Sequence, residues 1–366
     1  MSKAAELANL IGNINAGGGG VNRNVIINGA MNVAQRGTSF TSVGASDTQY
    51  TLDRFVWNTG NSAGRLTATQ DSSAPEGFAN SLKFACTTAD TSIAAGEFGI
   101  IQQPIEGQNV QQFAKGTSNA KPYAVSFYVK GNASATYVCE LWDNDTSGNR
   151  QISKTFNVTT DWTRVELSFP ADTTGALDDD NNSSFIFNIW LHGGSTYTGG
   201  TLNSSAWASL TSANRAAGIS SFFDSTDRTF FITGVQLEVG QNPTSFEHEP
   251  VERTIAKCQR YYYKYGGKNA YEYIPGIGQG NGSTFMINYQ YPVEMRAAPS
   301  INLGGDWRIN DTYGGSYYTF SGVAIDNATT LICRVHGNTS SAIGSDVGRI
   351  LAYGDIDAKW EHIAEL

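Results

Sequence analysis

The clearest alternation of apolar and polar positions lies in the middle of the chain, from Thr229 to Tyr265. A strand is predicted over its first part, with one side carrying Phe231, Thr233, Val235, Leu237 and Val239 and the other carrying Phe230, Ile232, Gly234, Gln236 and Glu238. Gly240 and Pro243 end this strand. After Pro250, the apolar spacing of Val251, Ile255 and Cys258 predicts a short helix. We expect the strand to close one β domain and the tyrosine-rich run after the helix to begin a second.

A different pattern opens the chain, where the apolar residues follow helical spacing. They are Ala4, Leu7, Leu10, Ile11 and Ile14. The positions 4, 7, 11 and 14 have the three-four spacing of a coiled-coil seam, but two turns are too short to be stable alone. Four glycines at 17–20 then predict a flexible joint. We interpret residues 1–20 as an anchor that docks on another protein or bundles with its copies; the alternative is a dispensable end.

Between these two regions the chain consists of short apolar runs divided by turn residues. GRLTATQD, NSLKFACTT, AVSFYVKG, TRVELSFP and SFIFNIWLHG are examples, and clusters such as DNDTSGN and DDDNN separate them. Many short strands with such punctuation indicate an antiparallel sandwich. The predicted fold is therefore all-β: a jelly-roll β-sandwich followed by a smaller C-terminal β-sandwich, with a short N-terminal helix. The predicted domains are residues 1–20, 21–249 and 250–366.

Several short motifs occur in a fixed order along the chain. They are NVIINGAMNVAQRGTSF, YTLDRFVW, EGFANSLKF, SFYVKG, DWTRVELSFP, RAAGISSFFDS, ITGVQLEVG, FEH, CQRYYYK and YPVEMRAAPS. In these motifs the chain resembles a group of phage virion proteins of the tail-fibre kind, from about Asn24 to Pro299. The order of the strands in residues 21–249 also resembles the jelly roll of carbohydrate-binding modules. The resemblance implies a structural or receptor-binding role and a three-fold assembly.

Composition excludes several other classes of protein. The net charge is −9 and no basic face is visible, so a nucleic-acid partner is not expected. No apolar run is long enough to span a membrane, and the first residues lack the pattern of a signal peptide. The cysteines, at positions 86, 139, 258 and 333, are widely and irregularly spaced. We expect four buried free thiols rather than disulfides or a zinc site.

No catalytic constellation is evident, so an enzyme is not predicted. The four histidines, His192, His248, His336 and His362, do not lie at metal-ligand spacing, and the G-x-S-x-G motif is absent. Neither a metal nor a cofactor is expected. Paired carboxylates could hydrolyse a glycosidic bond, and the acidic clusters at 143–145 and 178–180 are the available candidates. Turn chemistry also accounts for these clusters, because Asp and Asn side chains hydrogen-bond to their own backbone.

Aromatic residues beside polar loops suggest a sugar-binding surface instead. Sugars stack their apolar faces on exposed rings, while amides and carboxylates bind the hydroxyls. Trp207 and Tyr197 lie in a long segment between two predicted strands, and Trp207 is the best candidate for an exposed ring. Trp142, Asp143 and Asn144 form the other candidate group, although Trp142 also fits a core position.

These patterns together predict a phage virion structural protein, a tail fibre or other appendage of the virion, that binds a host cell-surface glycan during adsorption. Its expected partners are other tail proteins, contacted through the N-terminus, and the host polysaccharide. A homotrimer is expected from the helical seam and from the aromatic surface of the C-terminal domain. Two alternatives remain open: a purely structural adaptor or decoration protein, and a polysaccharide depolymerase.

Overall fold

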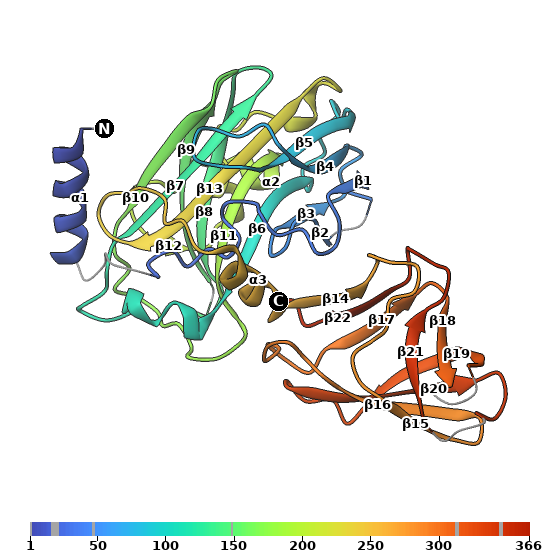
Figure 1. Ribbon diagram of the computed structural model, residues 1–366. Coiled ribbons are helices and arrows are strands. Elements are labelled where there is room, and N and C mark those ends of the chain that lie inside the picture. Colours follow the sequence, from blue (N-terminus) through green and yellow to red (C-terminus); the bar gives the residue numbers. More distant parts are fainter. Residues whose placement is uncertain (1, 16–21, 46–47, 148, 312–314, 344–346) are drawn as a thin grey trace. The chain divides into compact units, whose positions relative to one another are not determined.

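The computed structural model describes residues 2–15, 22–45, 48–147, 149–311, 315–343 and 347–366, and the four glycines of the predicted joint lie outside these ranges. The chain forms two compact units, the first comprising Met1–Thr254 together with Leu366 and the second Ile255–Glu365 (Figure 1). Both units consist mainly of antiparallel strands. The predicted class, all-β with a short N-terminal helix, is confirmed.

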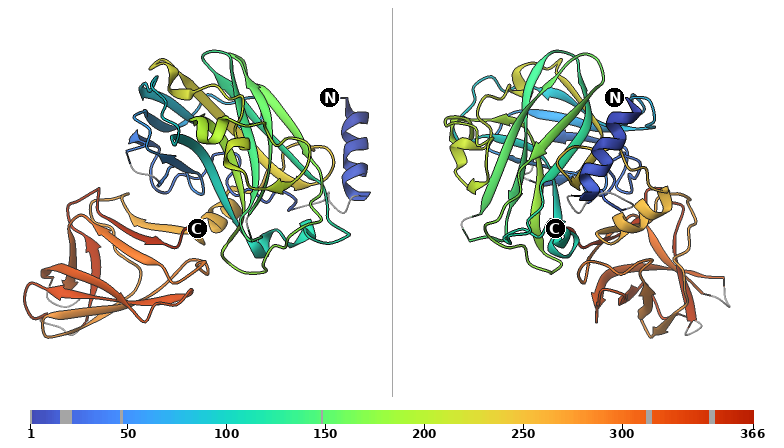
Figure 2. Two further views of the ribbon diagram at one scale, coloured as in Figure 1. Left: turned by 180° about the vertical axis from the view of Figure 1, so that it is seen from behind. Right: turned by 90° about the vertical axis from the view of Figure 1, so that its left-hand side faces the viewer.

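The first unit is a sandwich of two sheets (Figure 2). The six-stranded sheet has the order β1 (Ser39–Val43), β4 (Arg65–Asp71), β5 (Ser81–Thr88), β13 (Thr229–Val239), β7 (Tyr123–Gly131) and β10 (Thr163–Phe169). The seven-stranded sheet has the order β12 (Ala208–Ser209), β9 (Arg150–Val158), β8 (Ala135–Asp143), β11 (Ser183–Gly193), β6 (Phe98–Glu106), β3 (Val56–Gly60) and β2 (Thr48–Tyr50).

Strand β13 occupies the predicted position, but the predicted single alternation along it is wrong. Phe230 and Ile232 face the core in its first half, whereas Val235, Leu237 and Val239 do so in its second half. The change occurs at a bulge between Thr233 and Gln236, where Gly234 has a left-handed φ of +62°. A bulge adds one residue to one strand, so every later side chain moves to the opposite face.

Two peptide segments bury β13 beyond the bulge, one along its free edge and one over its outer face. The segment before β1 pairs with the strand through its backbone, since Val25 N donates to Leu237 O and Val235 N donates to Gly29 O. The segment after β13 is held by side chains of the strand. Glu238 accepts hydrogen bonds from the backbone and hydroxyl of Thr244. The strand is consequently buried along almost its full length.

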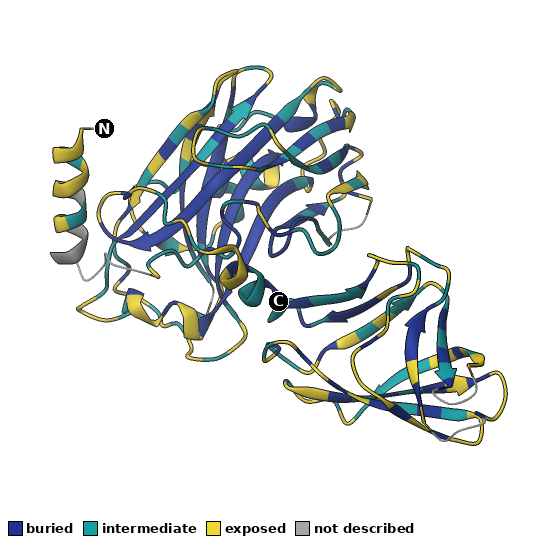
Figure 3. Ribbon diagram, in the orientation of Figure 1, coloured by how far each residue is buried: buried dark blue, intermediate teal, exposed yellow. Residues whose placement is uncertain are grey.

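The core of the first unit lies between the two sheets and contains inward-facing residues of both. Figure 3 shows buried residues along the central strands, and exposed residues mainly in the turns and loops. Strand β11 is buried at nine of its eleven positions, so its outer face is covered as well. Its cover is the segment between β11 and β13, which holds α2 (Ser195–Thr198) and three short elements: β12, η3 (Ser212–Asn214) and η4 (Phe222–Asp224).

The second unit is all-β, as predicted, but its strands form a closed barrel and a small sheet where a smaller β-sandwich was predicted. Six strands close into a barrel, in the order β15 (Gly278–Asn281), β16 (Thr284–Gln290), β20 (Ile332–Thr339), β19 (Tyr317–Asp326), β18 (Trp307–Asp311) and β21 (Val347–Ala352). The remaining three form a sheet in the order β14 (Tyr262–Gly266), β22 (Lys359–Ile363) and β17 (Ser300–Gly304). The barrel closes because β15 pairs with β21, and a bulge in β19 between Ser321 and Ala324 bends that strand.

The predicted helices are both present, as α1 (Lys3–Asn15) and α3 (Val251–Gln259). Of the predicted seam on α1, Ala4, Leu7 and Ile11 are exposed and Leu10 is half-buried, while the side chain of Ile14 lies outside the described residues. The four cysteines are buried free thiols, as predicted.

The bulge in β13 gives a stability prediction. A methyl group at Gly234 would lie 2.8 Å from the ring of Phe78 and 2.9 Å from that of Tyr128, at a left-handed backbone position. Gly218 is a matched control, because its φ is +88° but nothing lies within 4 Å of its would-be Cβ. Both alanine variants should lose about 1–2 kcal/mol to backbone strain, and Gly234→Ala about 1–3 kcal/mol more to overpacking. Urea denaturation measures the difference, and equal losses in the two variants would contradict this account of the bulge.

Candidate functional site

Trp207 was predicted to be an exposed ring, and that expectation is wrong. Its side chain is 8% exposed and packs against Tyr123 and Phe185 in the sandwich core. The indole Nε1 donates a hydrogen bond to Pro170 O at 2.9 Å. The ring points inward because the next two residues, as β12, pair with β9 and hold the segment against the sheet. Trp207 therefore offers no ring face to a sugar in this structure.

Asp143, another predicted candidate, is also engaged within the protein through its carboxylate. Its carboxylate lies 2.5 Å from Lys115 Nζ, and both side chains are fully buried. The same carboxylate accepts hydrogen bonds from the backbone of Asp145 and Thr146. Lys115 also pairs with Asp172. Asp143 therefore organises a buried ion network and leaves little capacity for a sugar hydroxyl.

The two acidic turns singled out from the sequence lie side by side. Asp178 N donates to Asp145 Oδ2 at 2.8 Å. Burial is the largest influence on Asp145 and raises the pKa of its carboxyl. The hydrogen bond between Asp178 and Asp145 thus explains why the two acidic turns lie together. Asn144, between the two aspartates of the first turn, is exposed and donates its amide hydrogen to Ser183 O.

Two of the predicted aromatic residues lie on one surface, the outer face of the seven-stranded sheet. Trp142 stands on β8 and Tyr197 on α2, and the side chains of Trp190 and Arg215 connect them. The Arg215 guanidinium lies 4.7 Å from the ring centre of Trp142 and 4.8 Å from that of Trp190. Tyr197 packs on Trp190 at 5.3 Å between ring centres. We call Glu140, Trp142, Trp190, Tyr197 and Arg215 the Trp142 cluster.

Glu140 is the polar centre of the Trp142 cluster. Arg215 binds it with two hydrogen bonds of 2.8 Å, and Trp190 Nε1 donates to it at 2.9 Å. Asn188 adds a further bond and continues the network through Gln102. A buried carboxylate is tolerated only when it is paired and hydrogen-bonded, and both conditions hold here. The network fixes the indole of Trp190. It also holds the guanidinium of Arg215 between the rings of Trp142 and Trp190.

The sequence analysis missed Glu140 and Arg215. Glu140 and Trp142 occupy alternate positions of β8, and Asn188 and Trp190 do so on β11. On each of these strands a polar residue lies two positions before a tryptophan, and residues two apart on a strand share a face. This spacing was visible in the sequence and could have indicated Glu140. Nothing in the sequence distinguished Arg215 from the other residues of its long segment, because its role depends on how that segment folds back over the sheet.

The members of the Trp142 cluster differ in exposure, which limits what the cluster can do. Glu140, Trp190 and Arg215 are buried, whereas Trp142 and Tyr197 are half-buried. Asn144 follows Trp142 at the end of β8 and is exposed. A partly exposed indole with a guanidinium against its ring, next to an exposed amide, can stack an apolar face and bind hydroxyls. Glu140, which already accepts four hydrogen bonds, is engaged within the protein.

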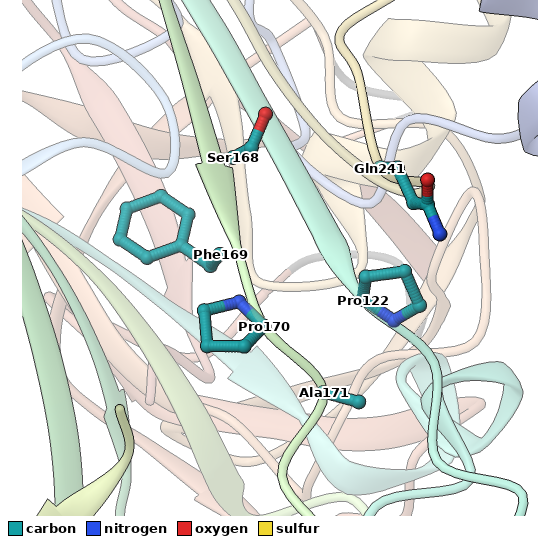
Figure 4. Close-up of a pocket in the computed structure, with 6 residues that line it drawn as sticks. All are labelled: Pro122, Ser168, Phe169, Pro170, Ala171 and Gln241. Atoms are coloured by element: carbon teal, nitrogen blue, oxygen red, sulfur yellow. The ribbon is translucent and has the colours of Figure 1, made fainter. Parts of the chain in front are cut away.

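Two surface pockets offer other chemistry, one in each unit. The first, of about 420 Å³, is lined by Pro122, Ser168, Phe169, Pro170, Ala171 and Gln241 (Figure 4). Its only aromatic ring, that of Phe169, is buried in the core. The second, also about 420 Å³, lies in the second unit and is lined by Tyr263, Pro275, Gly276, Asn288, Tyr289, Gln290 and Pro292. Tyr289 is buried in the core of this unit, so the pocket presents the half-buried ring of Tyr263 beside two exposed amides.

Comparison with known proteins gives one family match. Residues 79–198, about a third of the chain, match the model of a family described as a carbohydrate binding domain. Four members of the Trp142 cluster fall within this range, and Arg215 falls outside it. No curated protein matches the chain significantly.

Some solved structures are similar to this chain over part of its length. A CBM4 structure has 13% identity and a TM-score of 0.30, covering 58% of this chain and 97% of the other. A family 11 carbohydrate-binding module from Clostridium thermocellum, in complex with a mixed-linked tetrasaccharide, has 14% identity and a TM-score of 0.28, covering 58% and 99%. Tailspike protein 4 of bacteriophage CBA120 has 11% identity and a TM-score of 0.27, covering 59% and 21%.

Within the described ranges, no helix combines the length and the apolar character needed to cross a membrane.

The buried pair of Arg215 and Glu140 gives a prediction. Arg215→Met keeps an apolar side chain between the rings but leaves the Glu140 carboxylate buried without its charge partner. Removing one member of a buried ion pair costs about 3–5 kcal/mol. Lys83 is the control, because it pairs with Asp71 at 3.3 Å on the surface, and Lys83→Met should cost less than about 1 kcal/mol. Urea denaturation compares the two, and a loss below 1 kcal/mol for Arg215→Met would show that the pair does not hold the covering segment in place.

Proposed function

We propose that the protein binds a carbohydrate through its first unit. The observation that carries this proposal is the match of residues 79–198 to a carbohydrate binding domain, because the matched stretch contains Trp142 and Trp190. The ligand we propose is a glycan of a host cell surface. The protein would bind it as an appendage of a phage particle, in the manner of a tail fibre.

The contact surface we propose is the exposed margin of the Trp142 cluster. Trp142 presents part of its indole, and Asn144 presents an exposed side chain in the turn just after β8. The ring and the amide are only two residues apart, so both can contact one ligand. The guanidinium of Arg215 fixes the opposite side of the ring. A ring held in this way loses little side-chain entropy when a sugar stacks on it.

The motifs that resemble phage virion proteins support the particle context. ITGVQLEVG forms β13, and FEH lies in the segment that packs over it, where Glu247 N donates to Gln236 Oε1. NVIINGAMNVAQRG lies along the free edge of the same strand, where Asn24 bonds to its backbone. Motifs that are far apart in the sequence therefore meet on one strand. These motifs form one folding unit of this chain rather than a binding site.

A purely structural adaptor, without receptor binding, is the second candidate. The observation favouring it is the burial of the outer face of β11, where the segment between β11 and β13 covers Trp190 and Val138. A closed surface of this kind excludes a long polysaccharide from the centre of the sheet. Depolymerase activity is not proposed, because the acidic turns are engaged in their own hydrogen bonds.

A binding experiment separates the first two candidates. Purified full-length protein is titrated with polysaccharides from the envelopes of candidate bacterial hosts, and released oligosaccharides are assayed in parallel. The wild type should bind without cleavage, and Trp142→Ala should weaken binding at least tenfold. Trp162→Ala is the control, since Trp162 is also half-buried but packs on Phe231 of the other sheet. Binding that is unaffected by Trp142→Ala would exclude this surface, and no binding to any host polysaccharide would favour the adaptor.

We further propose that the protein is a homotrimer joined in part by α1 and that the helix contacts other tail proteins. Leu7 is 56% exposed and Ile11 is 50% exposed, so the helix presents apolar side chains that lack cover within the described part of the chain. Light scattering of the full-length chain should give about three times the monomer mass of 39.3 kDa. Leu7→Ser with Ile11→Ser should lower the trimer fraction, whereas Glu6→Ser, on the same helix, should not. A stable monomer at micromolar concentration would exclude the trimer.

A further inference from the structure

Three side chains that can ligate a metal meet at one end of the sandwich. Asp90 lies in the turn after β5, Glu97 immediately precedes β6, and His192 is the penultimate residue of β11. The three come from separate parts of the sequence, and their spacing matches no metal-binding motif. Their ligating atoms all lie within 4.8 Å of one another. The cluster is separate from the Trp142 cluster, with which it shares no residue.

All three side chains are removed from solvent. Asp90 is 5% exposed, Glu97 is 6% exposed and His192 is fully buried. His192 Nε2 lies 3.5 Å from Glu97 Oε2, which is within ion-pair range for a protonated imidazole, and neither atom has a hydrogen bond to another described group. Burying a carboxylate or an imidazole nitrogen without a partner is costly. The two atoms therefore point at each other across a gap that a hydrogen bond does not fill.

Neighbouring groups hold the imidazole and the aspartate in their orientations. His192 Nδ1 is hydrogen-bonded to Ser221 Oγ at 2.9 Å, and Ser221 Oγ is itself fixed by the backbone N–H of Phe223. Asp90 Oδ2 accepts hydrogen bonds from Ser62 Oγ and from Ala63 N. In metal sites the second nitrogen of a ligating histidine is typically hydrogen-bonded in this way, which orients the first nitrogen towards the ion.

The geometry fits a small tetrahedral ion. Zn²⁺ binds imidazole nitrogen and carboxylate oxygen at about 2.0–2.2 Å, so neighbouring ligand atoms in a tetrahedral site lie about 3.3–3.6 Å apart. The separation of 3.5 Å between His192 Nε2 and Glu97 Oε2 is within this range. Ca²⁺ and Mg²⁺ favour six or more oxygen ligands, whereas a nitrogen with two carboxylates suits zinc and its first-row neighbours.

We propose that Asp90, Glu97 and His192 bind a divalent transition-metal ion, with Zn²⁺ as the expected ion. The ion supplies the positive charge that two buried carboxylates need and occupies the gap between Nε2 and Oε2. It joins the turn after β5 to the ends of β6 and β11, and through Ser221 to η4. Its role is to stabilise this end of the sandwich. The site is independent of the proposed carbohydrate contact.

Metal titration of the full-length protein tests this proposal. The protein is stripped with a chelator, and Zn²⁺ binding is followed by calorimetry and by metal analysis after desalting. The wild type should retain about one equivalent of Zn²⁺, and its melting temperature should rise by several degrees. Co²⁺ in place of Zn²⁺ should give the visible absorption of a tetrahedral site. Absence of Zn²⁺ binding by the wild type at 100 µM added metal would overturn the proposal without any variant.

Substitutions then test which residues hold the ion. His192→Gln and Glu97→Gln should each reduce the retained Zn²⁺ to a small fraction of an equivalent and abolish the rise in melting temperature. His336→Gln is the matched control, because His336 Nε2 lies 3.6 Å from Asp326 Oδ2 but is well exposed to solvent. Circular dichroism of the stripped proteins confirms that each variant is folded. Zn²⁺ retention that is lost in the His336 variant and kept in the other two would assign the metal elsewhere and refute this site.

Discussion

The first unit depends on how the outer face of β13 is covered. The strand runs through the middle of the six-stranded sheet, and its polar residues Gln236 and Glu238 are fully buried on the side away from the core. Glu238 is satisfied by Thr244 and by an ion pair of 3.2 Å with Arg23. The two covering segments are separated by more than 200 residues, so this strand brings the beginning and the end of the unit together. Buried polar groups of this kind specify one arrangement, because any other would leave them without partners.

The seven-stranded sheet uses the same device on its own outer face. There the buried carboxylate is Glu140 and its partner is Arg215, which comes from the segment that follows β11. In each sheet a loop reaches over a central strand, and an arginine or a threonine on it meets a glutamate on the sheet. If the partner of either glutamate moves away, its carboxylate is left buried and unpaired, which costs free energy. This cost holds both loops against their sheets.

The sequence predicted the elements whose signals are local. The limits of β13 and α3 follow from Gly240, Pro243 and Pro250, and the buried cysteines follow from their irregular spacing. Alternation failed at Gly234, because one residue in a left-handed conformation reverses every later position while the sequence still reads as a regular strand. Local patterns also could not show that the second unit closes into a barrel, since closure depends on the pairing of β15 with β21.

The residues of the candidate sites were harder to predict from the sequence than the secondary structure, because their partners lie far away in the chain. Trp207 lies in a polar segment and has the composition of an exposed loop residue, yet a two-residue strand holds its ring in the core. Arg215 and His192 acquire their roles from contacts with Glu140 and Glu97, which lie 75 and 95 residues earlier in the chain. A side chain whose partner is that distant carries no spacing signal. Trp142 fitted both a core position and a sugar-contacting position in the sequence, and its side chain is half-buried near the end of β8.

The covering of the seven-stranded sheet has a consequence for how a glycan could bind. The segment after β11 closes the centre of the face, so Trp142 and Asn144 remain accessible only at its margin. A ligand at a margin meets one ring and few hydroxyl partners, and it buries less area than a ligand in a cleft. Its affinity for one site is then low, because little free energy remains after the loss of translational freedom on binding. Under the proposed function, adhesion therefore requires several copies of the site in one assembly, where effective concentration replaces the affinity of a single site. This links a partly closed binding face to the assembly proposed for the helix at the start of the chain.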